Sequence, residues 1–567
     1  MAGEFQVVGK NNKAKFSLKV HRGDGMALLA MDWLGGRPPD DFVGFTIEYK
    51  EPESTRVKAV YNRIAFPGPT GEVDARKLSS RVSPFQTFRW VHFPFNPELS
   101  GEYTYIVTPV FMDADRALIH DEPQTVRIEL RRETYPGHLN IAYTRGFISS
   151  QAFVDRYADD GPIETLLPER SEDGLVFTPS HPKAEEALKW MGFEARDAIL
   201  ETLKEAIEDD TASVYVVAYD LSEKEFVERL RQLGPRLKII IDDDGDHGEP
   251  HSGETQAAEI LAASAGVMNV KRQNMGKLQH NKMIVVDGTR VKKAIGGSTN
   301  FSWRGFYVQS NNAMIFTGDT AVQVFREAFE DFWTETGFSN SRSASWRDLG
   351  IPGVDVQVTF SPHAPANAQL VKIAADIDST KSSLLFSLAF LYQTPGLIRD
   401  AVARIRDKDD RFVYGISDKK VGGLDVQRPD GNPPTAFPTA LLKGKTPPPF
   451  RAEPVGGSGN RMHHKFVVID FDKPSARVYL GSYNFSKAAD ETNGENLILA
   501  RDRRIAVSYM VQALSIFDHY HFRIAVKEAK KKGEPLQLKL PPKDGGDPWF
   551  TKHYTDPRRI KDREMFA

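Results

Sequence analysis

Along the first 135 residues, apolar side chains occur in short runs that glycine, proline and aspartate interrupt. Runs such as FSLKV, FVGFTIEYK and YTYIVTPVFM are rich in valine, isoleucine, phenylalanine and tyrosine. These residue types favour strands, and turn residues at short intervals between strands are typical of antiparallel sheets. The pattern therefore predicts an all-β sandwich domain over residues 1–135.

One tyrosine in this region suggests a subtype of sandwich. Tyr103 follows Leu99-Ser-Gly-Glu and precedes Thr-Tyr-Ile-Val. The segment resembles the tyrosine corner of immunoglobulin-like and fibronectin-like domains, in which the tyrosine hydroxyl bonds the backbone a few residues upstream. The alternative is a tyrosine of an ordinary strand core. We expect an accessory domain of the immunoglobulin or fibronectin type.

After Pro136 the pattern changes to apolar runs of strand length that alternate with segments of helical periodicity. Alternation of this kind predicts sheets covered by helices, which is an α/β or α+β architecture. The predicted strands are 212–221, 237–244, 354–360, 382–392 and 411–417, and the predicted helices are 183–210, 223–234, 366–381 and 395–408. We expect two such units, over residues 139–340 and 350–526, and an extended tail over 527–567.

A motif that occurs twice relates the two units. Residues 280–287 read HNKMIVVD and are followed by GGSTN, and residues 463–470 read HHKFVVID and are followed by GSYN. The histidines at 280 and 463 lie 183 positions apart, as do the prolines at 179 and 362. Equal offsets at distant points predict two structurally equivalent halves that share one composite site.

The repeated residue types suit a phosphodiester. Alternation along a strand places the histidine and lysine of each copy on one face, and the glycine of Gly-Ser-x-Asn allows a ligand to approach the backbone closely. Hydrolysis of a phosphodiester needs a nucleophile, a proton for the leaving oxygen and neutralisation of charge on phosphate. Histidine, lysine and asparagine supply these functions, and we expect no metal or other cofactor.

The two copies resemble the HxK(x)4D…GSxN motif of the phospholipase D superfamily over roughly residues 139–526. The resemblance implies a pseudo-dimer of two sheet-and-helix halves, and a two-step mechanism through a covalent phosphohistidine. His280 is then the nucleophile and His463 the general acid. The lysines and asparagines hold the phosphate, and the aspartates orient the motif through imidazole hydrogen bonds. The catalytic residues that this implies are His280, Lys282, Asp287, Asn300, His463, Lys465, Asp470 and Asn484.

The chain departs from the superfamily pattern at two points. The gap between the aspartate and Gly-Ser is longer than usual in both copies, which implies longer hairpins. Eleven residues after the motif asparagine, the second half carries Glu495 and the first half Asn311. We place both in the expected substrate-binding set with Ser298 and Ser482, and expect the two halves to have different roles.

Composition narrows the class of partner. Of the 567 residues, 40% are hydrophobic and 27% are charged, which fits a globular protein, and the net charge of −3 signals no global attraction to nucleic acid. There are no cysteines, which excludes disulfides and thiolate metal sites. The N-terminal residues lack a signal-peptide core and no window reaches the ~18 apolar residues of a membrane span. We expect a cytoplasmic protein, with export lacking a signal as the alternative.

The substrate remains a choice between two classes. A phospholipid head group is our first interpretation, since the glycine- and proline-rich stretch 421–459 could contact a membrane surface. A metal-independent nuclease is the alternative, with Lys292-Lys293 and Trp303-Arg304 as candidate contacts to a DNA or RNA strand. The sequence leaves the oligomeric state open.

Overall fold

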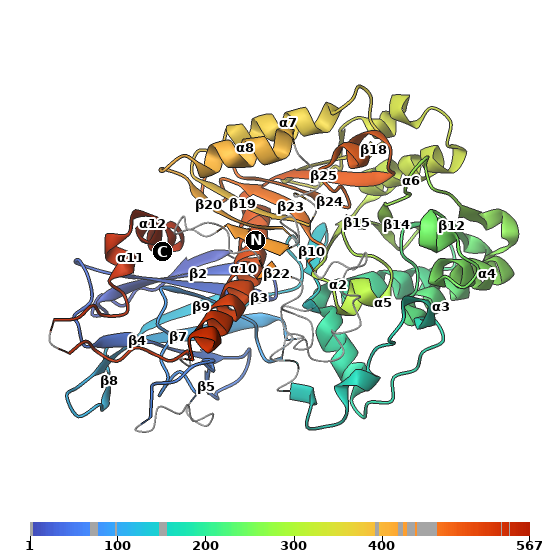
Figure 1. Ribbon diagram of the computed structural model, residues 1–567. Coiled ribbons are helices and arrows are strands. Elements are labelled where there is room, and N and C mark those ends of the chain that lie inside the picture. Colours follow the sequence, from blue (N-terminus) through green and yellow to red (C-terminus); the bar gives the residue numbers. More distant parts are fainter. Residues whose placement is uncertain are drawn as a thin grey trace.

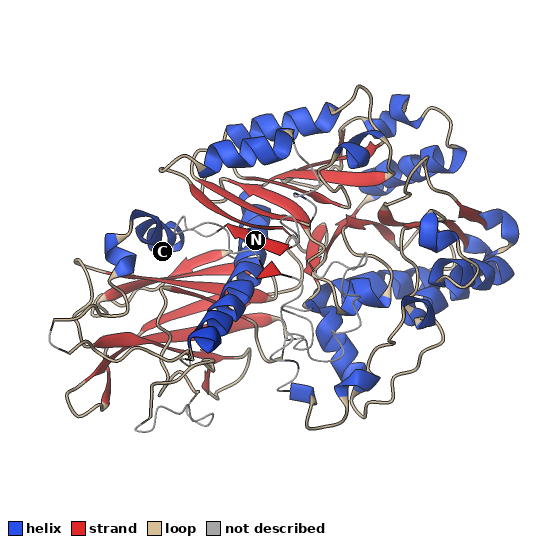
Figure 2. Cartoon of the chain, in the orientation of Figure 1, coloured by secondary structure: helices blue, strands red, loops and turns tan. Residues whose placement is uncertain are grey.

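The computed structural model places a β-sandwich beside two sheet-and-helix halves that face each other (Figure 1). Helices and strands segregate accordingly, with the sandwich almost free of helix in its layers (Figure 2). The structure describes residues 4–68, 78–96, 99–146, 153, 156–389, 391, 396–417, 423–427, 437–438, 462–533, 536–543 and 545–567.

Two antiparallel sheets form the sandwich, as the strand pattern predicts. Apolar side chains of both sheets, among them Phe16, Phe45 and Tyr105, meet in one core. The first sheet has the order β1 (Gln6–Val8), β2 (Phe16–Gly23), β3 (Met26–Trp33), β6 (Arg89–His92). The second has the order β5 (Lys58–Ala59), β4 (Phe42–Lys50), β7 (Gly101–Met112), β8 (Leu118–His120), with β9 (Gln124–Leu130) also paired to β7.

The first half is built on a mixed seven-stranded sheet with helices packed on it. The sheet has the order β10 (Leu139–Tyr143), β16 (Asn312–Thr317), β15 (Lys292–Gly297), β14 (Lys282–Asp287), β11 (Ser213–Ala218), β12 (Leu237–Ile241), β13 (Val270–Arg272). Its helices are α2 (Ala184–Glu208), α3 (Lys224–Leu233), α4 (Gly253–Ala265), α5 (Trp303–Tyr307) and α6 (Asp319–Thr334).

The second half repeats this plan on a nine-stranded sheet. The order is β17 (Arg347–Asp348), β18 (Asp355–Ser361), β25 (Glu495–Arg501), β24 (Arg477–Gly481), β23 (Lys465–Ile469), β19 (Ser383–Leu388), β20 (Phe412–Ser417), β21 (Gly423–Gln427), β22 (Phe437–Pro438). Its helices are α7 (Ala368–Asp378), α8 (Leu397–Arg406), α9 (Lys487–Glu491) and α10 (Arg503–Lys532).

Six strands of each sheet, from β10 to β12 in the first and from β18 to β20 in the second, have the same order and pairing, which confirms the predicted pseudo-dimer. In each sheet the motif strand, β14 or β23, lies between two antiparallel neighbours. One is the return strand of its own hairpin, and the other is β11 or β19, which pairs in parallel with the next strand of the sheet. Both motif strands are buried, so their apolar residues form a continuous run. After each Gly-Ser-x-Asn, a serine hydroxyl accepts from a backbone N–H and caps a short helix, Ser302 for α5 and Ser486 for α9.

The C-terminal segment differs from the predicted extended tail. Helix α10 continues to Lys532, and α11 (Lys552–Thr555) and α12 (Pro557–Phe566) follow. Helix α10 runs along β2 of the sandwich, and α12 packs between β3 and β20 (Figure 1). Arg563 pairs with Asp32 of the sandwich. The tail therefore joins the sandwich to the second half. The prediction missed this because the apolar anchors Trp549, Phe550 and Phe566 are widely spaced among charges.

The tyrosine corner is present in the sandwich. The hydroxyl of Tyr103 donates to the carbonyl of Leu99 at 3.1 Å and lies 3.3 Å from the carbonyl of Asn96. The bond spans four residues, as the resemblance to immunoglobulin-like domains implies. It ties the connection before β7 to the core.

Replacing Tyr103 with Phe removes this hydroxyl and keeps the ring. We expect the free energy of unfolding to fall by about 1 kcal/mol, because the bond to the backbone is lost. The urea midpoint, followed by circular dichroism, measures the change. Tyr61→Phe is the control, since the side chain of Tyr61 is 68% exposed. Equal midpoints for the two variants would contradict the expectation.

Candidate active site

The two motif hairpins bring both Gly-Ser-x-Asn segments to the interface between the halves. The glycines Gly297 and Gly481 have φ values of +144° and +134°. A Cβ on Gly297 would lie 2.5 Å from the carbonyl oxygen of Asn312, and one on Gly481 would lie 2.2 Å from that of Asn496. Glycine is thus required at both positions by backbone conformation and by close packing. The serine that follows is turned into the interface.

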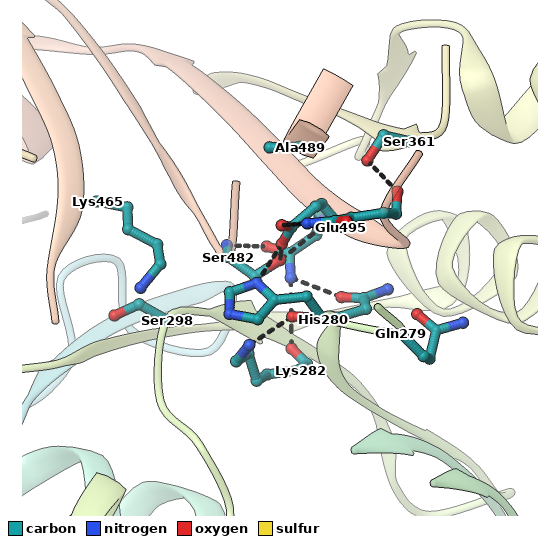
Figure 3. Close-up of polar contacts among 12 residues, drawn as sticks. Gln279, His280, Lys282, Ser298, Ser361, Lys465, Ser482, Ala489 and Glu495 are labelled. Atoms are coloured by element: carbon teal, nitrogen blue, oxygen red, sulfur yellow. Dashed lines mark hydrogen bonds and ion pairs between the residues drawn. The ribbon is translucent and has the colours of Figure 1, made fainter. Parts of the chain in front are cut away.

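The two motif histidines lie close together, one from each half. The ring centroids of His280 and His463 are 6.4 Å apart, with an interplanar angle of 64°. Both side chains are buried. The composite site that the repeat predicts is therefore present, and Figure 3 shows His280, Lys282 and Lys465 around it.

His280 is held by a carboxylate from the opposite half. Its Nδ1 lies 2.8 Å from Oε2 of Glu495, which also accepts from the hydroxyl of Ser482 at 2.7 Å (Figure 3). Asn493 donates to the other oxygen of Glu495 at 3.3 Å. Burial raises the pKa of Glu495 to about 8, against the opposing effect of Lys282. Burial, and then Lys282 and Lys465, lower the pKa of His280 well below its usual range.

His463 is held by an amide from the first half. Its Nδ1 lies 2.8 Å from Oδ1 of Asn311 and 3.2 Å from the carbonyl oxygen of Ser298. Both neighbours accept, and Nδ2 of Asn311 donates to the carbonyl of Gly305 at 2.9 Å. His463 therefore carries its proton on Nδ1 and presents Nε2 as a lone pair. Burial and the nearby Lys465 and Lys282 lower its pKa well below the usual range.

The motif lysines add positive charge beside the imidazoles. Lys282 and Lys465 each donate through Nζ to the carbonyl of the histidine two residues before, His280 and His463. The ammonium of Lys282 also lies 4.5 Å from the ring centroid of Tyr219. Burial lowers the pKa of Lys282 to about 8, although Glu495 raises it. Asp220 and Asp242 act on Lys282 in the same direction as Glu495. Two buried lysines beside the imidazoles still provide positive charge to which an anion can bind.

The motif asparagines differ in their surroundings. Nδ2 of Asn300 donates to Asp220 at 2.6 Å. The Oδ1 atoms of Asn300 and Asn484 are buried and have no hydrogen-bond partner among the described residues. Asp220 also pairs with Nε2 of His247 at 3.2 Å. Asn300 is thus anchored through an acid–histidine network.

The same network contains the one group of potential metal ligands found among the described residues. Ligand atoms of Asp220, His247 and Glu254 lie within 4.8 Å of one another. Both ring nitrogens of His247 are already bound, to Asp220 and to Asp242. Although burial disfavours its charge, these bonds raise the pKa of His247 to about 11. An imidazolium does not ligate a cation, so the geometry is that of an ion-pair network.

The motif aspartates lie away from the imidazoles, so the expectation of aspartate–imidazole hydrogen bonds is wrong. Asp287 accepts from Lys292 and from Arg326, each at 2.6 Å. Asp470 accepts from the backbone N–H groups of Lys381 and Ser382 at 2.9 and 2.8 Å. Both stand at the far ends of the motif strands, where they stabilise the hairpin and a neighbouring loop.

The predicted substrate-binding set also needs correction. Glu495 and Asn311 contact the imidazoles, and the hydroxyls of Ser482 and Ser298 donate to these two groups at 2.7 and 3.0 Å. All four residues lie behind the histidines. They orient the rings, in the position that the sequence analysis assigned to the aspartates.

Three of the four residues proposed to contact a nucleic-acid strand make contacts within the first half instead. Lys292 pairs with Asp287, and Lys293 pairs with Glu205. The side chain of Trp303 is buried at the start of α5. Three of these four candidates therefore serve the fold of the first half. The other segment tied to the choice of substrate, 421–459, lies outside the described residues except for 423–427 and 437–438.

Sequence reasoning missed Tyr219, Asp220 and His247. The ring of Tyr219 contacts both His280 and His247, with centroids 4.5 Å apart in each case. Asp220 follows the carboxyl end of β11, a strand parallel to β12. Polar residues at such strand ends commonly line ligand sites, and this signal was available in the sequence.

Two comparisons place the chain among known proteins. The family model described as "Cardiolipin synthase, PLD-like domain" matches residues 199–333 and 373–520. The phospholipase D of Rickettsia felis is 46% identical over 48 residues, and that of Rickettsia bellii is 43% identical over 53 residues. The chain spans 22% and 24% of the length of these relatives, and the matches cover 8% and 9% of this chain.

Solved structures similar to this chain include a phosphatidylserine synthase and a phospholipase D family member. Phosphatidylserine synthase of Haemophilus influenzae Rd KW20 is 14% identical, with a TM-score of 0.39, over 66% of this chain and 93% of that one. Nuc of Salmonella typhimurium, a phospholipase D family member, is 25% identical, with a TM-score of 0.20, over 25% of this chain and 88% of that one.

Among the helices that the structure describes, none has the length and apolar character that a membrane span requires.

The two segments matched by the family model contain both motif hairpins. They also contain the described residues that are reported above as contacts of the two imidazoles. The chain belongs to the phospholipase D superfamily.

Proposed function

We propose that the protein is a phospholipase D-type phosphodiesterase that releases the head group of a phospholipid through a phosphohistidine. The observation that carries the proposal is the pair of buried imidazoles, 6.4 Å apart, with a lysine from each half beside them. Two imidazoles at this separation can bracket one phosphorus atom, one on the attacking side and one on the leaving side.

In the first step, Nε2 of His280 attacks phosphorus and forms an N–P bond. The bond from phosphorus to the head-group oxygen breaks, and His463 gives its Nε2 proton to that oxygen. In the second step, His463 takes a proton from water, which attacks phosphorus and breaks the N–P bond. Lys282 and Lys465, with Asn300 and Asn484, neutralise and orient the non-bridging oxygens.

The unlike partners of the two imidazoles support this division of roles. A carboxylate behind His280 fixes the proton on Nδ1, exposes the Nε2 lone pair and stabilises the positive charge that develops on attack. The amide of Asn311 orients His463 without adding negative charge, so its imidazolium remains the stronger acid. A bound diester brings an anion between the lysines, which raises the pKa of His463 and allows it to hold the proton it donates.

The choice of a lipid over a nucleic acid rests on two observations. The family model and the relatives in Rickettsia carry the descriptions of lipid enzymes. Lys292, Lys293 and Trp303, the candidate contacts to a nucleic-acid strand, are occupied by internal contacts. We therefore propose the lipid substrate, and the incubation described next tests nuclease activity as the alternative.

Incubation with labelled substrates separates the two classes. Wild type and His280→Ala are given phosphatidylcholine, phosphatidylethanolamine, and single- and double-stranded DNA, each with and without EDTA. We expect release of a lipid head group by wild type alone and no DNA cleavage. Cleavage of DNA without head-group release would establish the nuclease instead. Loss of activity on addition of EDTA would contradict the metal-free mechanism.

The covalent step predicts which histidine carries the phosphoryl group. Wild type is mixed with substrate, quenched without acid and digested, and the peptides are analysed by mass spectrometry. We expect the adduct on His280. His463→Ala lacks the acid of the first step as well as the base of the second, so it is given a p-nitrophenyl phosphodiester, whose leaving group departs without a proton. With that substrate the variant is expected to accumulate more of the adduct, since hydrolysis slows by about 10²- to 10⁴-fold. An adduct found only on His463 would reverse the roles.

The shifted groups predict the pH profile of kcat/KM. The Glu495 carboxylate ionises, and the Lys282 ammonium is lost, as pH rises through about 8. Activity that needs the first ionised and the second protonated is bell-shaped, with a maximum near pH 8.

Glu495→Gln is expected to remove the rising limb and to lower kcat by about 10²-fold or more. Its counterpart Asn311→Asp adds a carboxylate beside His463 and raises the pKa of that histidine, which makes it a weaker acid and lowers kcat, while the falling limb set by Lys282 stays in place. A wild-type rising limb in Glu495→Gln together with a wild-type kcat in Asn311→Asp would exclude these residues as positioning groups.

A further inference from the structure

A cavity lies outside the candidate active site, where the sandwich meets helix α10 and the C-terminal helices. Its volume is about 420 Å³, within the ~300–1,000 Å³ range of sites for small organic molecules. Aromatic rings form much of its wall: Phe85, Trp90 and Phe93 of the sandwich, Trp190 of α2, Tyr414 of β20 and Phe522 of α10. Its described lining includes none of the motif residues.

One guanidinium in this cavity is buried without a counter-ion. Arg145 lines the cavity and is only 2% exposed. Its Nε and Nη2 have no hydrogen-bond partner, and no carboxylate of the described residues lies within ion-pair distance of it. Aromatic rings surround it instead, with centroids 4.3 Å away for Phe193, 4.4 Å for Trp190 and 5.7 Å for Phe93.

A second arginine of the cavity, Arg89, has carboxylate partners, in contrast to Arg145. Arg89 is also buried, yet it binds Asp518, and its Nε lies 3.0 Å from Asp562. The nearest acid to influence Arg145 is Glu194, which accepts from the backbone N–H groups of Gly25 and Tyr143 at 2.8 and 3.4 Å. The acids of the region are therefore already occupied.

Arg145 stays positively charged in this setting. Burial lowers its pKa to about 9, which leaves it protonated at pH 7. Stacked rings offset part of the cost of burying the charge. They do not supply acceptors for its N–H groups, and a buried donor without an acceptor is a costly arrangement that an anion would relieve.

We propose that this cavity binds an amphiphilic anion, with an apolar chain along the aromatic wall and a carboxylate or phosphate monoester on Arg145. The planar guanidinium matches either head group with paired hydrogen bonds. The aromatic wall buries the chain. The site is separate from the motif histidines, so the proposal does not depend on which diester the catalytic centre cleaves.

Binding of three probes with the same chain tests the head group. Dodecanoate, dodecyl phosphate and dodecanol are titrated into the full-length protein below their micelle concentrations. Fluorescence of Trp90 and Trp190 and isothermal titration calorimetry follow binding. We expect one or both anions to bind at least about 30-fold more tightly than dodecanol, the factor for a ~2 kcal/mol charge-assisted bond. Preference for the carboxylate or for the phosphate identifies the source, a fatty acid or a lipid phosphate.

Two variants locate the site. Arg145→Gln is expected to bind the anions as weakly as dodecanol, and Arg145→Lys is expected to retain part of the affinity as a matched cation. Ser515→Phe, on α10, fills the cavity and is expected to abolish binding of all three probes. Circular dichroism and the melting temperature verify folding, and Ser515→Phe decides the matter if Arg145→Gln does not fold.

Three results would overturn the proposal. One is the absence of binding by either anion. Another is equal affinity for dodecanol and the anions. The third is unchanged anion binding in a folded Arg145→Gln or Ser515→Phe protein, which would leave Arg145 with a packing role only.

Discussion

Each catalytic imidazole is held by a residue of the opposite half, and the rest of the site depends on this exchange. Glu495 of the second half bonds His280, and Asn311 of the first half bonds His463. Neither half alone contains an oriented histidine. The backbone bond from Gly494 N–H to the carbonyl of Leu278, at 2.9 Å, helps to hold the halves in the required register. The contacts that orient the two imidazoles therefore also help to stabilise the interface between the halves.

This interface concentrates positive charge where water is excluded. Lys282 and Lys465 lie beside the two imidazoles, and Glu495 is the acid hydrogen-bonded to His280. In an environment of low polarity, such an excess is costly until an anion enters, and interactions with that anion are strong. The electrostatics thus favour a phosphate ester before any side chain moves. The unlike partners, a carboxylate and an amide, then give two chemically similar histidines different electrostatic surroundings.

The sandwich is joined to the catalytic halves through burial and not by a flexible tether. Helix α10 belongs to the second half, yet it packs along β2, and α12 fills the space between β3 and β20. His21 of the sandwich lies 2.6 Å from the carbonyl oxygen of Phe566 through its Nε2. Contacts between residues more than 500 positions apart close the structure, and the aromatic cavity around Arg145 is formed by this closure.

The sequence alone determined the architecture and the family. Period-two runs predicted the sandwich, and alternating periodicities predicted the two halves. Equal spacing of the two motifs predicted one shared site, because local patterns record which face of a strand is buried. The position eleven residues after the motif asparagine is Glu495 in the second half and Asn311 in the first, and this difference predicted that the two halves are not identical. These features depend on residues near one another in the chain, so one sequence is enough to read them.

Only the tertiary structure decided which groups touch. Asp287 and Asp470 belong to the motif by spacing, but they stand at the far strand ends, and Glu495 and Asn311 reach the rings from across the interface. The tail folds into helices that bridge two domains, and Arg145 becomes a buried cation with no acid among the described residues within ion-pair distance. Such contacts depend on how separate elements pack, and a hydrophobic pattern specifies the buried face of an element without specifying what lies against it.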